Sequence, residues 1–234
     1  GGGALINWGE YQFCSSSSDK ATDILVNADN VIISTGTNGV YVIEYNLSSN
    51  QSQIGIQGIT RWDSGNFLAS NRITDLQMMG NQLLISTENA GISRRDLATS
   101  TWLSRWSTGN TLASNNVLGT SVSDGWLHVL AGNTLQSYEI SSGIFRAQET
   151  MSGLGLLDSA VSISSWPSGI GFRGPTNGMS IIIDSTGVMA MQHEDAPVGV
   201  EYLVSSPVTD PMRLAVSIED SEDGQIWVAG DTTI

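Results

Sequence analysis

The chain has 234 residues, of which 40% are hydrophobic, so it can bury a sizeable core as one large all-β domain or as two ordinary domains. Its 23 acidic residues against 9 basic ones give a formal net charge of −14, which argues against binding to nucleic acid or to anionic membranes. No apolar run reaches the roughly 18 residues that a membrane-spanning helix needs, and a single cysteine, Cys14, excludes an internal disulfide.

The first predicted strands belong to a segment that recurs along the chain. TDILVNADNVIISTGTNGVYVIEY (22–45) aligns without a gap with TDLQMMGNQLLISTENAGISRRDL (74–97), so that Asp23 falls on Asp75 and Gly39 on Gly91. A third copy, NNVLGTSVSDGWLHVLAGNTLQSYEI, follows, and further copies begin near 160 and 211. Regular repetition of this kind is the sequence signature of a repeat architecture.

Each copy predicts four short strands. An alternating apolar segment leads to a turn pair, a second β-rich run follows, a Gly-containing loop leads to a third strand, and an aromatic fourth strand ends the unit. In the second copy these last three runs are LLIST, GISRRDL and TWLSRW. The turn pairs are Asp29-Asn30, Gly80-Asn81, Asp124-Gly125, Ser168-Gly169 and Asp223-Gly224.

Four strands per repeat are typical of a β-propeller blade, whereas a β-sandwich would not repeat one motif in register. We therefore expect an all-β fold, a single β-propeller of four-stranded blades over 1–234. Five blades are favoured, closed by pairing of the N- and C-terminal strands, because GALINWGEYQF near the start resembles missing outer strands. The alternative is a fragment of a ring with six to eight blades. The expected blades are about 21–71, 72–115, 116–159, 160–210, and 211–234 plus 1–20.

The copies resemble the repeats of two-component regulator propellers, a family of sensor domains. The resemblance spans essentially the whole chain, and the matching stretches are NFLASNRITDL, NTLASNNVLGT, GLLDSAVSIS and, closest of all, IEDSEDGQIWVAG. The sequence departs from the family pattern at Ala69, Ala113 and Leu157, which stand where the family usually has Pro. The resemblance implies an extracellular or periplasmic propeller used for ligand sensing or protein contact, and it implies no catalytic residue.

Two stretches, TRWDSGNFLASN and SRWSTGNTLASN, are nearly identical. Within the repeat they join one blade to the next. We expect Trp62 and Trp106 to lie near the end of an outer strand and to be buried against the neighbouring blade. The short polar residues that follow them should cap the turn through hydrogen bonds from side chain to backbone. Both stretches are therefore interpreted as scaffold.

Several stretches contain residue types that carry chemistry in other proteins. EDSEDGQ (219–225) lacks the final Glu of a calcium loop and is interpreted as a solvated turn, and QHEDAP (192–197) places its His and two acids on opposite faces of an extended segment. His128 is expected to be an ordinary imidazole on a second strand, and Cys14 a small buried hydrophobe. Asp23 and Asp75 occupy equivalent places, which favours a repeated structural role. No metal site and no cofactor are predicted.

A binding site is expected on the face made by the loops between second and third strands and by the connections between blades. Arg173 is the only base among the residues that these loops present, and it could anchor a carboxylate or an acidic partner. Asn46 and Asn50 begin N-x-S sequences that could carry glycans. The ligand-binding candidates are Asn38, Glu88, Asn89, Asn133, Arg173, Asn177 and Asp231.

These features favour a non-catalytic ligand- or protein-binding module of an exported or cell-surface protein, in an extracellular, cell-surface or periplasmic location. Its partner would be a small molecule, a glycan or another protein. One alternative is a hydrolase or lyase that acts on a polysaccharide through carboxylates in the central funnel; carboxylates buried together there would favour it. A third reading is a structural repeat segment of a larger surface protein.

Overall fold

The computed structural model describes residues 20–27, 29–47, 54–123 and 125–150, together with the strands that lie between 162 and 230. All regular elements in this part of the chain are β-strands. They form four antiparallel sheets of four strands each and one sheet of two strands, and every sheet is a simple up-and-down meander. The expected all-β architecture of four-stranded units is confirmed for these strands.

The sheets follow one another in chain order. The first contains β1 (Ala21–Val26), β2 (Asn30–Thr35), β3 (Val40–Leu47) and β4 (Ile54–Trp62). The second contains β5 (Ile73–Met79), β6 (Gln82–Thr87), β7 (Gly91–Asp96) and β8 (Thr101–Trp106). The third contains β9 (Val117–Ser123), β10 (Trp126–Ala131), β11 (Thr134–Glu139) and β12 (Ile144–Thr150). The fourth contains β13 (Ser162–Trp166), β14 (Met179–Ile183), β15 (Val188–Gln192) and β16 (Tyr202–Val204), and the last contains β17 (Pro211–Ser217) and β18 (Gln225–Gly230).

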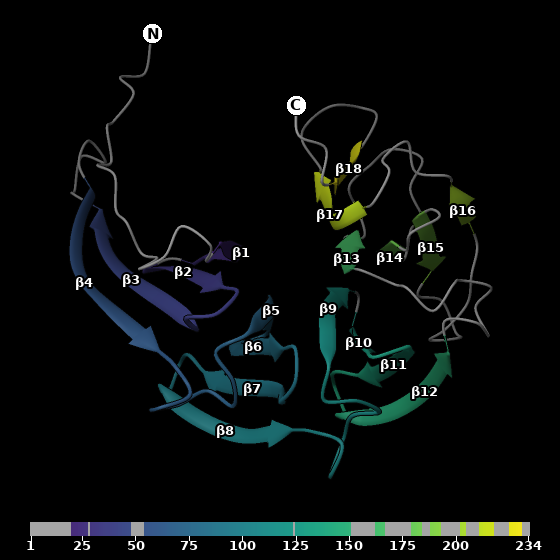
Figure 1. Cartoon of the computed structure of the whole chain (residues 1–234), viewed down its shortest axis with the longest axis horizontal. Helices are drawn as coiled ribbons and strands as arrows, with labels where there is room; N and C mark the ends of the chain where they lie inside the picture. The colour runs from purple at the N-terminus through teal and green to yellow at the C-terminus, as the bar shows by residue number, and fades with distance from the viewer. Residues whose placement is uncertain are drawn as a thin grey trace, which may run out of the picture.

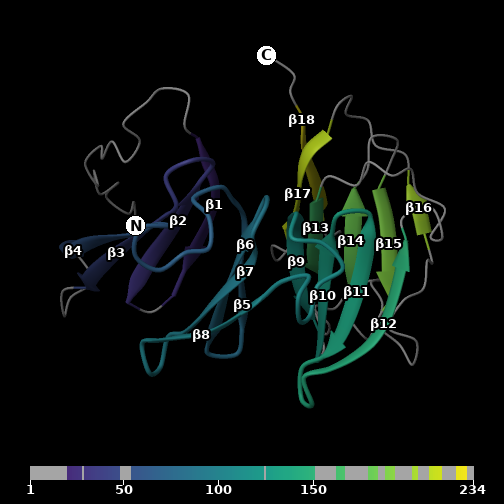
Figure 2. The same cartoon turned by 60° about the horizontal axis from the view of Figure 1, so that its bottom comes forward.

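The first strands of successive sheets lie side by side. In Figures 1 and 2 the sheets are arranged along an arc, with the first strand of each sheet inside and the fourth strand of each complete sheet at the outer rim. Contacts between strands follow the same order, from β1 to β5, to β9, to β13 and to β17. This radial arrangement of meanders is that of a β-propeller.

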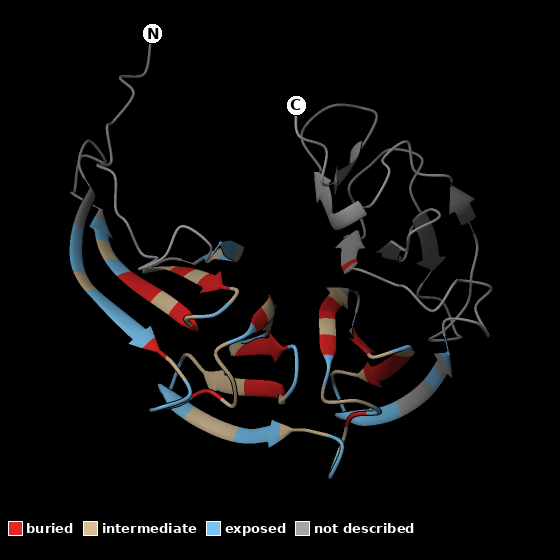
Figure 3. Ribbon diagram, viewed as in Figure 1, coloured by how far each residue is buried: buried red, intermediate tan, exposed pale blue. Residues whose placement is uncertain are grey.

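The hydrophobic core lies between neighbouring sheets. In the first three sheets, Figure 3 shows the middle strands β6, β10 and β11 mostly buried and the outer strands β4, β8 and β12 mostly exposed or intermediate, while the inner strand β1 is exposed or intermediate. The position of strand β6 between two sheets explains its sequence. Leu83 and Ile85 pack toward the first sheet and Leu84 packs toward the third, so these consecutive residues are all apolar. A strand that is covered on both faces needs such a continuous apolar run instead of alternation.

An irregularity recurs in the first strand of the sheets. The pairing register shifts by one residue at Thr22 in β1, at Thr74 in β5, at Leu118 in β9 and at Met212 in β17. A β-bulge of this kind bends the strand and increases its twist. Its recurrence at one place in four sheets makes it part of the repeat.

The predicted turns are observed where the structure describes them. Gly80 and Gly125 have φ values of 60° and 84°, which only glycine adopts without strain. The first turn has a different basis, because the side chain of Asn27 accepts hydrogen bonds from the N–H groups of Asp29 and Asn30 at 3.0 and 2.8 Å. The turn pairs expected at 168–169 and 223–224 lie outside the described residues.

One face of the first sheet stays uncovered among the described residues. Ile24 and Val26 of β1 are 60% and 62% exposed. The residues equivalent to Ile24 in the next two sheets, Leu76 and Thr120, are only 6% and 2% exposed because each packs against the preceding sheet. The strands predicted to close the ring from residues 1–20 lie outside the described residues, apart from Lys20, and so does Cys14.

Candidate functional site

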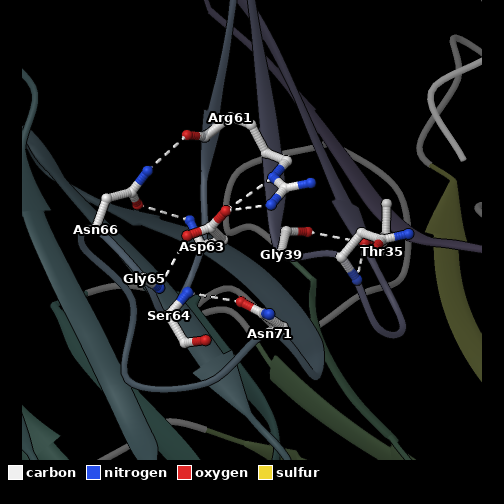
Figure 4. A network of polar contacts seen from close by, with 9 residues as sticks. Thr35, Gly39, Arg61, Asp63, Ser64, Gly65, Asn66 and Asn71 are labelled. Carbon is white, nitrogen blue, oxygen red and sulfur yellow. Dashed lines mark hydrogen bonds and ion pairs between the residues drawn. The ribbon is translucent and has the colours of Figure 1, made fainter. Parts of the chain in front are cut away.

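Figure 4 shows the turn after β4, which belongs to the first of the two similar stretches. The Asn66 side chain bridges it: Oδ1 accepts from the N–H of Asp63 at 2.8 Å, and Nδ2 donates to the carbonyl oxygen of Arg61 at 3.2 Å. Asn71 Oδ1 accepts from the N–H of Ser64 at 2.6 Å. The predicted capping by short polar side chains is confirmed.

The second stretch repeats these bonds. Asn110 Oδ1 accepts from the N–H of Ser107 at 2.8 Å, and Nδ2 donates to the carbonyl oxygen of Arg105 at 2.9 Å. Asn115 Oδ1 accepts from the N–H of Thr108 at 2.9 Å. Side chains that satisfy the same main-chain groups in both copies fix the backbone, so these asparagines are scaffold.

The first stretch adds an ion pair. Arg61 Nε lies 2.9 Å from Asp63 Oδ2, and the N–H of Gly65 donates to Asp63 Oδ1 at 2.8 Å. The hydrogen bond from Arg61, followed by that from Gly65, lowers the pKa of Asp63, and the same pairing with Asp63 raises the pKa of Arg61. Ser107 stands in place of Asp63 in the second copy, so this ion pair belongs to the first copy alone of the two.

Both tryptophans of the repeated stretches pack against the neighbouring sheet; Trp62 is buried as predicted, and Trp106 is partly buried. Trp62 is 6% exposed, and its ring meets Trp102 of the next sheet edge-on, with centroids 5.3 Å apart. Trp106 stacks on Tyr138 of the third sheet at 5.9 Å. Arginines of β7 cover the other sides of these rings: Arg95 Cζ lies 4.8 Å from the Trp62 centroid, and Arg94 Cζ lies 4.4 Å from that of Trp106. Burial lowers the pKa of both arginines.

The loops between second and third strands have a rigid backbone. Thr35 Oγ1 donates to the carbonyl oxygen of Gly39 at 3.0 Å and accepts from the N–H of Asn38 at 3.0 Å. Thr87 makes the equivalent bonds in the second sheet, to Gly91 O at 2.7 Å and from Ala90 N at 3.0 Å. The threonine hydroxyl therefore closes the loop in both sheets.

These loops and the connections between sheets form one face of the molecule. The N–H of Gly39 donates to the carbonyl oxygen of Asn71 at 3.0 Å, and that of Gly91 donates to Asn115 at 2.9 Å. Each of these bonds ties a loop to the connection that leaves its sheet. In the third sheet, Gly132 N donates at 2.7 Å to the carbonyl of Asn116, in the connection that enters it. We call this surface the loop face.

Four of the predicted ligand-binding residues lie on the loop face. Asn38 is half-buried, and Glu88, Asn89 and Asn133 are exposed in the equivalent loops of the second and third sheets. The other three predicted candidates, Arg173, Asn177 and Asp231, lie outside the described residues.

The structure adds Arg72 to the loop face. Its guanidinium pairs with Glu88 at 2.8 Å, and its carbonyl oxygen accepts from the N–H of Glu88 at 3.1 Å. The sequence prediction missed Arg72 because its named candidates came only from the loops between second and third strands, although the connections between blades were expected on the same face. The repeat contained the signal, since Arg72 directly precedes a first strand, as Asn116 does in the next copy.

The acids of the first strands hold neighbouring sheets together. Asp23 Oδ2 accepts from the N–H of Leu76 at 3.0 Å. Asp75, which is 9% exposed, accepts from both the N–H and the hydroxyl of Thr120, at 2.9 and 2.7 Å. In the third sheet Gly119 replaces the acid. The structural role predicted for Asp23 and Asp75 is confirmed, and we call these contacts the inner carboxylate bonds.

The remaining candidates for chemistry are either buried in the fold, as His128 is, or lie outside the described residues. His128 is fully buried, with Nδ1 2.8 Å from the hydroxyl of Ser137, as expected for an interior imidazole. Among the described residues, no group of three or more His, Cys, Asp or Glu side chains could hold a metal ion. Segments 193–197 and 219–224 lie outside those residues. In the same part of the chain, no helix is long and apolar enough to cross a bilayer.

No family model and no curated protein matches the sequence. Among solved structures, the chain is similar to the extracellular domain of the hybrid two component system BT4673 from B. thetaiotaomicron, with a TM-score of 0.60 and 15% identity over 92% of this chain and 26% of that one. The corresponding domain of BT3049 from the same organism gives 0.54 and 14%, over 92% and 32%. BamB from Moraxella catarrhalis gives 0.51 and 10%, over 88% and 54%.

These similarities concern the fold, because all three identities are below 16%. Two of these structures are extracellular domains of two component systems, so the resemblance seen in the sequence is supported at the level of the propeller architecture. The chain spans about a quarter to about half of the length of these structures.

Proposed function

We propose that the chain is a non-catalytic binding module, the propeller part of an exported or cell-surface protein, and that it recognises its partner through the loop face. The observation that carries this proposal is that the loop face combines a fixed backbone with exposed polar side chains. Its backbone is fixed by the threonine bonds and by the ties to the connections, while Glu88, Asn89 and Asn133 present exposed side chains. A rigid scaffold that presents polar side chains is the usual construction of a binding surface.

The chemistry of the described acids supports binding over catalysis. A glycosidase needs two carboxyl groups that face a common substrate, one of them with a raised pKa. Asp23 and Asp75 instead direct Oδ2 to main-chain N–H groups of the next sheet. Acceptors used in this way fix the distance between sheets.

The location proposed for the module rests on the solved structures that it resembles. Two of them are extracellular domains of two component systems. An extracellular or periplasmic surface also suits a chain with a net charge of −14 and no basic stripe. The partner class proposed is a small molecule, a glycan or a protein surface that accepts hydrogen bonds and one ion pair.

We further propose that the ring has five blades and that residues 1–20 complete the sheet begun by β17 and β18. The support is the exposed apolar face of the first sheet. Ile24 stands where Leu76 and Thr120 are buried against the sheet before them, and Val26 stands where Met78 and Val122 are partly buried. A preceding blade would remove these two side chains from water and leave no open sheet edge.

The test of the binding face is a matched pair of double variants. Glu88→Ala/Asn89→Ala alters the loop face, and Asp29→Ala/Asn81→Ala likewise removes one acid and one asparagine from exposed turns at the other ends of the strands. The purified full chain and both variants are screened on arrays of neutral and acidic oligosaccharides and of peptides, and the affinities of bound probes are measured by calorimetry. We expect the first variant to weaken binding by about tenfold or more and the second to leave it unchanged.

Two results would count against the proposal. Equal binding by both double variants would remove the loop face from recognition. Release of reducing ends from a polysaccharide by the purified chain, abolished by Asp75→Asn in a variant that stays folded, would assign an enzymatic role to the inner carboxylates.

A further inference from the structure

Two equivalent grooves lie at the outer rim, where the connection between two sheets meets the third and fourth strands of the later sheet. The first has a volume of about 280 Å³ and is lined by Phe67, Trp102 and Arg105, among others. The second has a volume of about 610 Å³ and includes Thr111 and Phe145 in its lining. The repeat makes the two grooves directly comparable, and Phe67 in the first stands where Thr111 stands in the second.

In the first groove the protein supplies its own ring. Phe67 follows Asn66 in the connection and stacks on Trp102 of β8, with ring centroids 5.4 Å apart and planes 11° from parallel. Trp102 pairs with Arg95 across the sheet. The face of the rim aromatic residue is therefore covered by a residue of the connection.

In the second groove that ring is absent. Thr111 occupies the place of Phe67, and Phe145 of β12 occupies the place of Trp102, because it pairs with Tyr138 as Trp102 pairs with Arg95. Phe145 is 46% exposed, and its ring meets Tyr138 edge-on at 5.6 Å. An aromatic ring thus remains open at the position where the neighbouring groove holds a stacked pair.

Hydrogen bonds hold the floor of the second groove in place. Tyr138 donates from its hydroxyl to the carbonyl oxygen of Thr111 at 2.8 Å, and Gln136 accepts from the N–H of Ala113 at 2.7 Å. Its burial raises the pKa of Tyr138 to about 12, so this phenol is neutral at physiological pH. These bonds fix the floor of the groove against the connection.

The walls are polar but uncharged. Among the described residues that line the second groove, none is charged. In the described part of the chain, the hydroxyls of Thr108 and Thr111 and the amide of Gln148 take part in none of the bonds that hold the turn, and Gln148 lies opposite Gln136 across the sheet. Such groups can donate to and accept from hydroxyls.

We propose that this groove is a second binding site, separate from the loop face, and that it takes a neutral sugar ring stacked on Phe145. The flat apolar face of a pyranose suits the open aromatic ring, and its hydroxyls suit Thr108, Thr111 and Gln148. An anionic ligand is disfavoured because the walls offer no cation and the net charge of the chain is −14.

The test fills the groove as the neighbouring one is filled. In Thr111→Phe the new ring should stack on Phe145 as Phe67 stacks on Trp102, with little cost to folding because Phe67 is itself 49% exposed. The full chain is screened on an array of neutral glycans, and the bound oligosaccharides are titrated by calorimetry. Thr111→Phe and Phe145→Ala should each weaken binding by about tenfold or more, whereas Phe145→Trp, which copies Trp102, should keep it.

The controls separate this site from the loop face and from unfolding. Glu88→Ala/Asn89→Ala should leave glycan binding at the groove unchanged, and thermal melts check that each variant is folded. The proposal is overturned if no neutral glycan binds, or if a bound glycan is insensitive to Thr111→Phe. Binding only of aromatic peptides, lost in Thr111→Phe, would overturn the sugar assignment and make the groove a peptide site.

Discussion

At the scale of single residues, the inner carboxylate bonds join neighbouring sheets through single side chains. Asp75 uses one oxygen to accept from both the main chain and the side chain of Thr120, in a buried position. Asp23 accepts from the main-chain N–H groups of Leu76 and Ile24 and is partly exposed. A carboxylate that accepts from buried donors stabilises a fold by more than a neutral acceptor does, since hydrogen bonds to charged groups are the stronger ones.

This difference gives a prediction for stability. Asp75→Ala leaves the buried N–H of Thr120 without its acceptor and should lower the free energy of unfolding by about 2–3 kcal/mol, whereas Asp23→Ala should cost about 1 kcal/mol. Urea unfolding followed by tryptophan fluorescence measures both. If Asp75→Ala is as stable as the parent chain, the carboxylate is not a structural clamp, and its position near the axis would need a chemical explanation.

The role of the two acids could be predicted from the sequence because both occupy the same place in an ungapped alignment. The repeat marks the position of Arg72 before a first strand, but its ion pair with Glu88 could not be predicted in the same way. Its pairing with Glu88 depends on the approach of a connection to a loop 16 positions later, which only the folded backbone defines. The open ring of Phe145 was missed for a similar reason, because its exposure depends on Thr111 in a distant connection.

At the scale of elements, the first strands could be predicted from alternation, the second strands from β-rich runs such as LLIST, and the turns from glycine and asparagine. The fourth strand TWLSRW was predicted at the positions of β8 (Thr101–Trp106). What the pattern did not reveal was the use of Asn27 in the first turn, since an asparagine that ends a strand and one that caps a turn look alike in sequence. Gly91 shows a second limit, because two separate features of the fold require glycine there. Its φ of 80° lies in the left-handed region, and a Cβ would overlap with the carbonyl oxygen of Trp106.

A pair of glycine variants in the second sheet separates these two requirements. Gly80 has a φ of 60° with open space around the position of a Cβ, so Gly80→Ala should cost only the left-handed backbone term of about 1 kcal/mol. Gly91→Ala adds the overlap with Trp106 and should cost about 3 kcal/mol or more. Thermal unfolding of both variants gives the comparison, and equal losses would show that the connection yields freely at Trp106.

At the scale of the whole molecule, a cross-link tests whether the arc of sheets closes into a ring between β17 and β1. If the ring closes, β17 lies beside β1 as β1 lies beside β5. Arg213 then approaches Ile24 in the way that Asp23 approaches Leu76. In a Cys14→Ser background, Ile24→Cys/Arg213→Cys should then form an intramolecular disulfide, because neighbouring first strands approach within the reach of such a bond. Mass spectrometry after oxidation detects it.

The control for this cross-link is Ile24→Cys/Glu139→Cys in the same background, which places the second thiol on the third sheet and should stay reduced. Absence of the disulfide in Ile24→Cys/Arg213→Cys, with both thiols reactive, would contradict closure between these two strands. The exposed face of the first sheet would then belong to contacts with further blades, as in a larger ring.

The inner carboxylate bonds also have a direction, since each acid reaches the sheet that comes later in the chain. During synthesis, Asp23 remains hydrated until β5 has emerged and folded beside it, and Asp75 waits in the same way for β9. At the usual pace of translation, this delay is on the order of seconds per sheet. These two bonds therefore suit growth in chain order, in which the second sheet partly withdraws Asp23 from water and the third sheet buries Asp75.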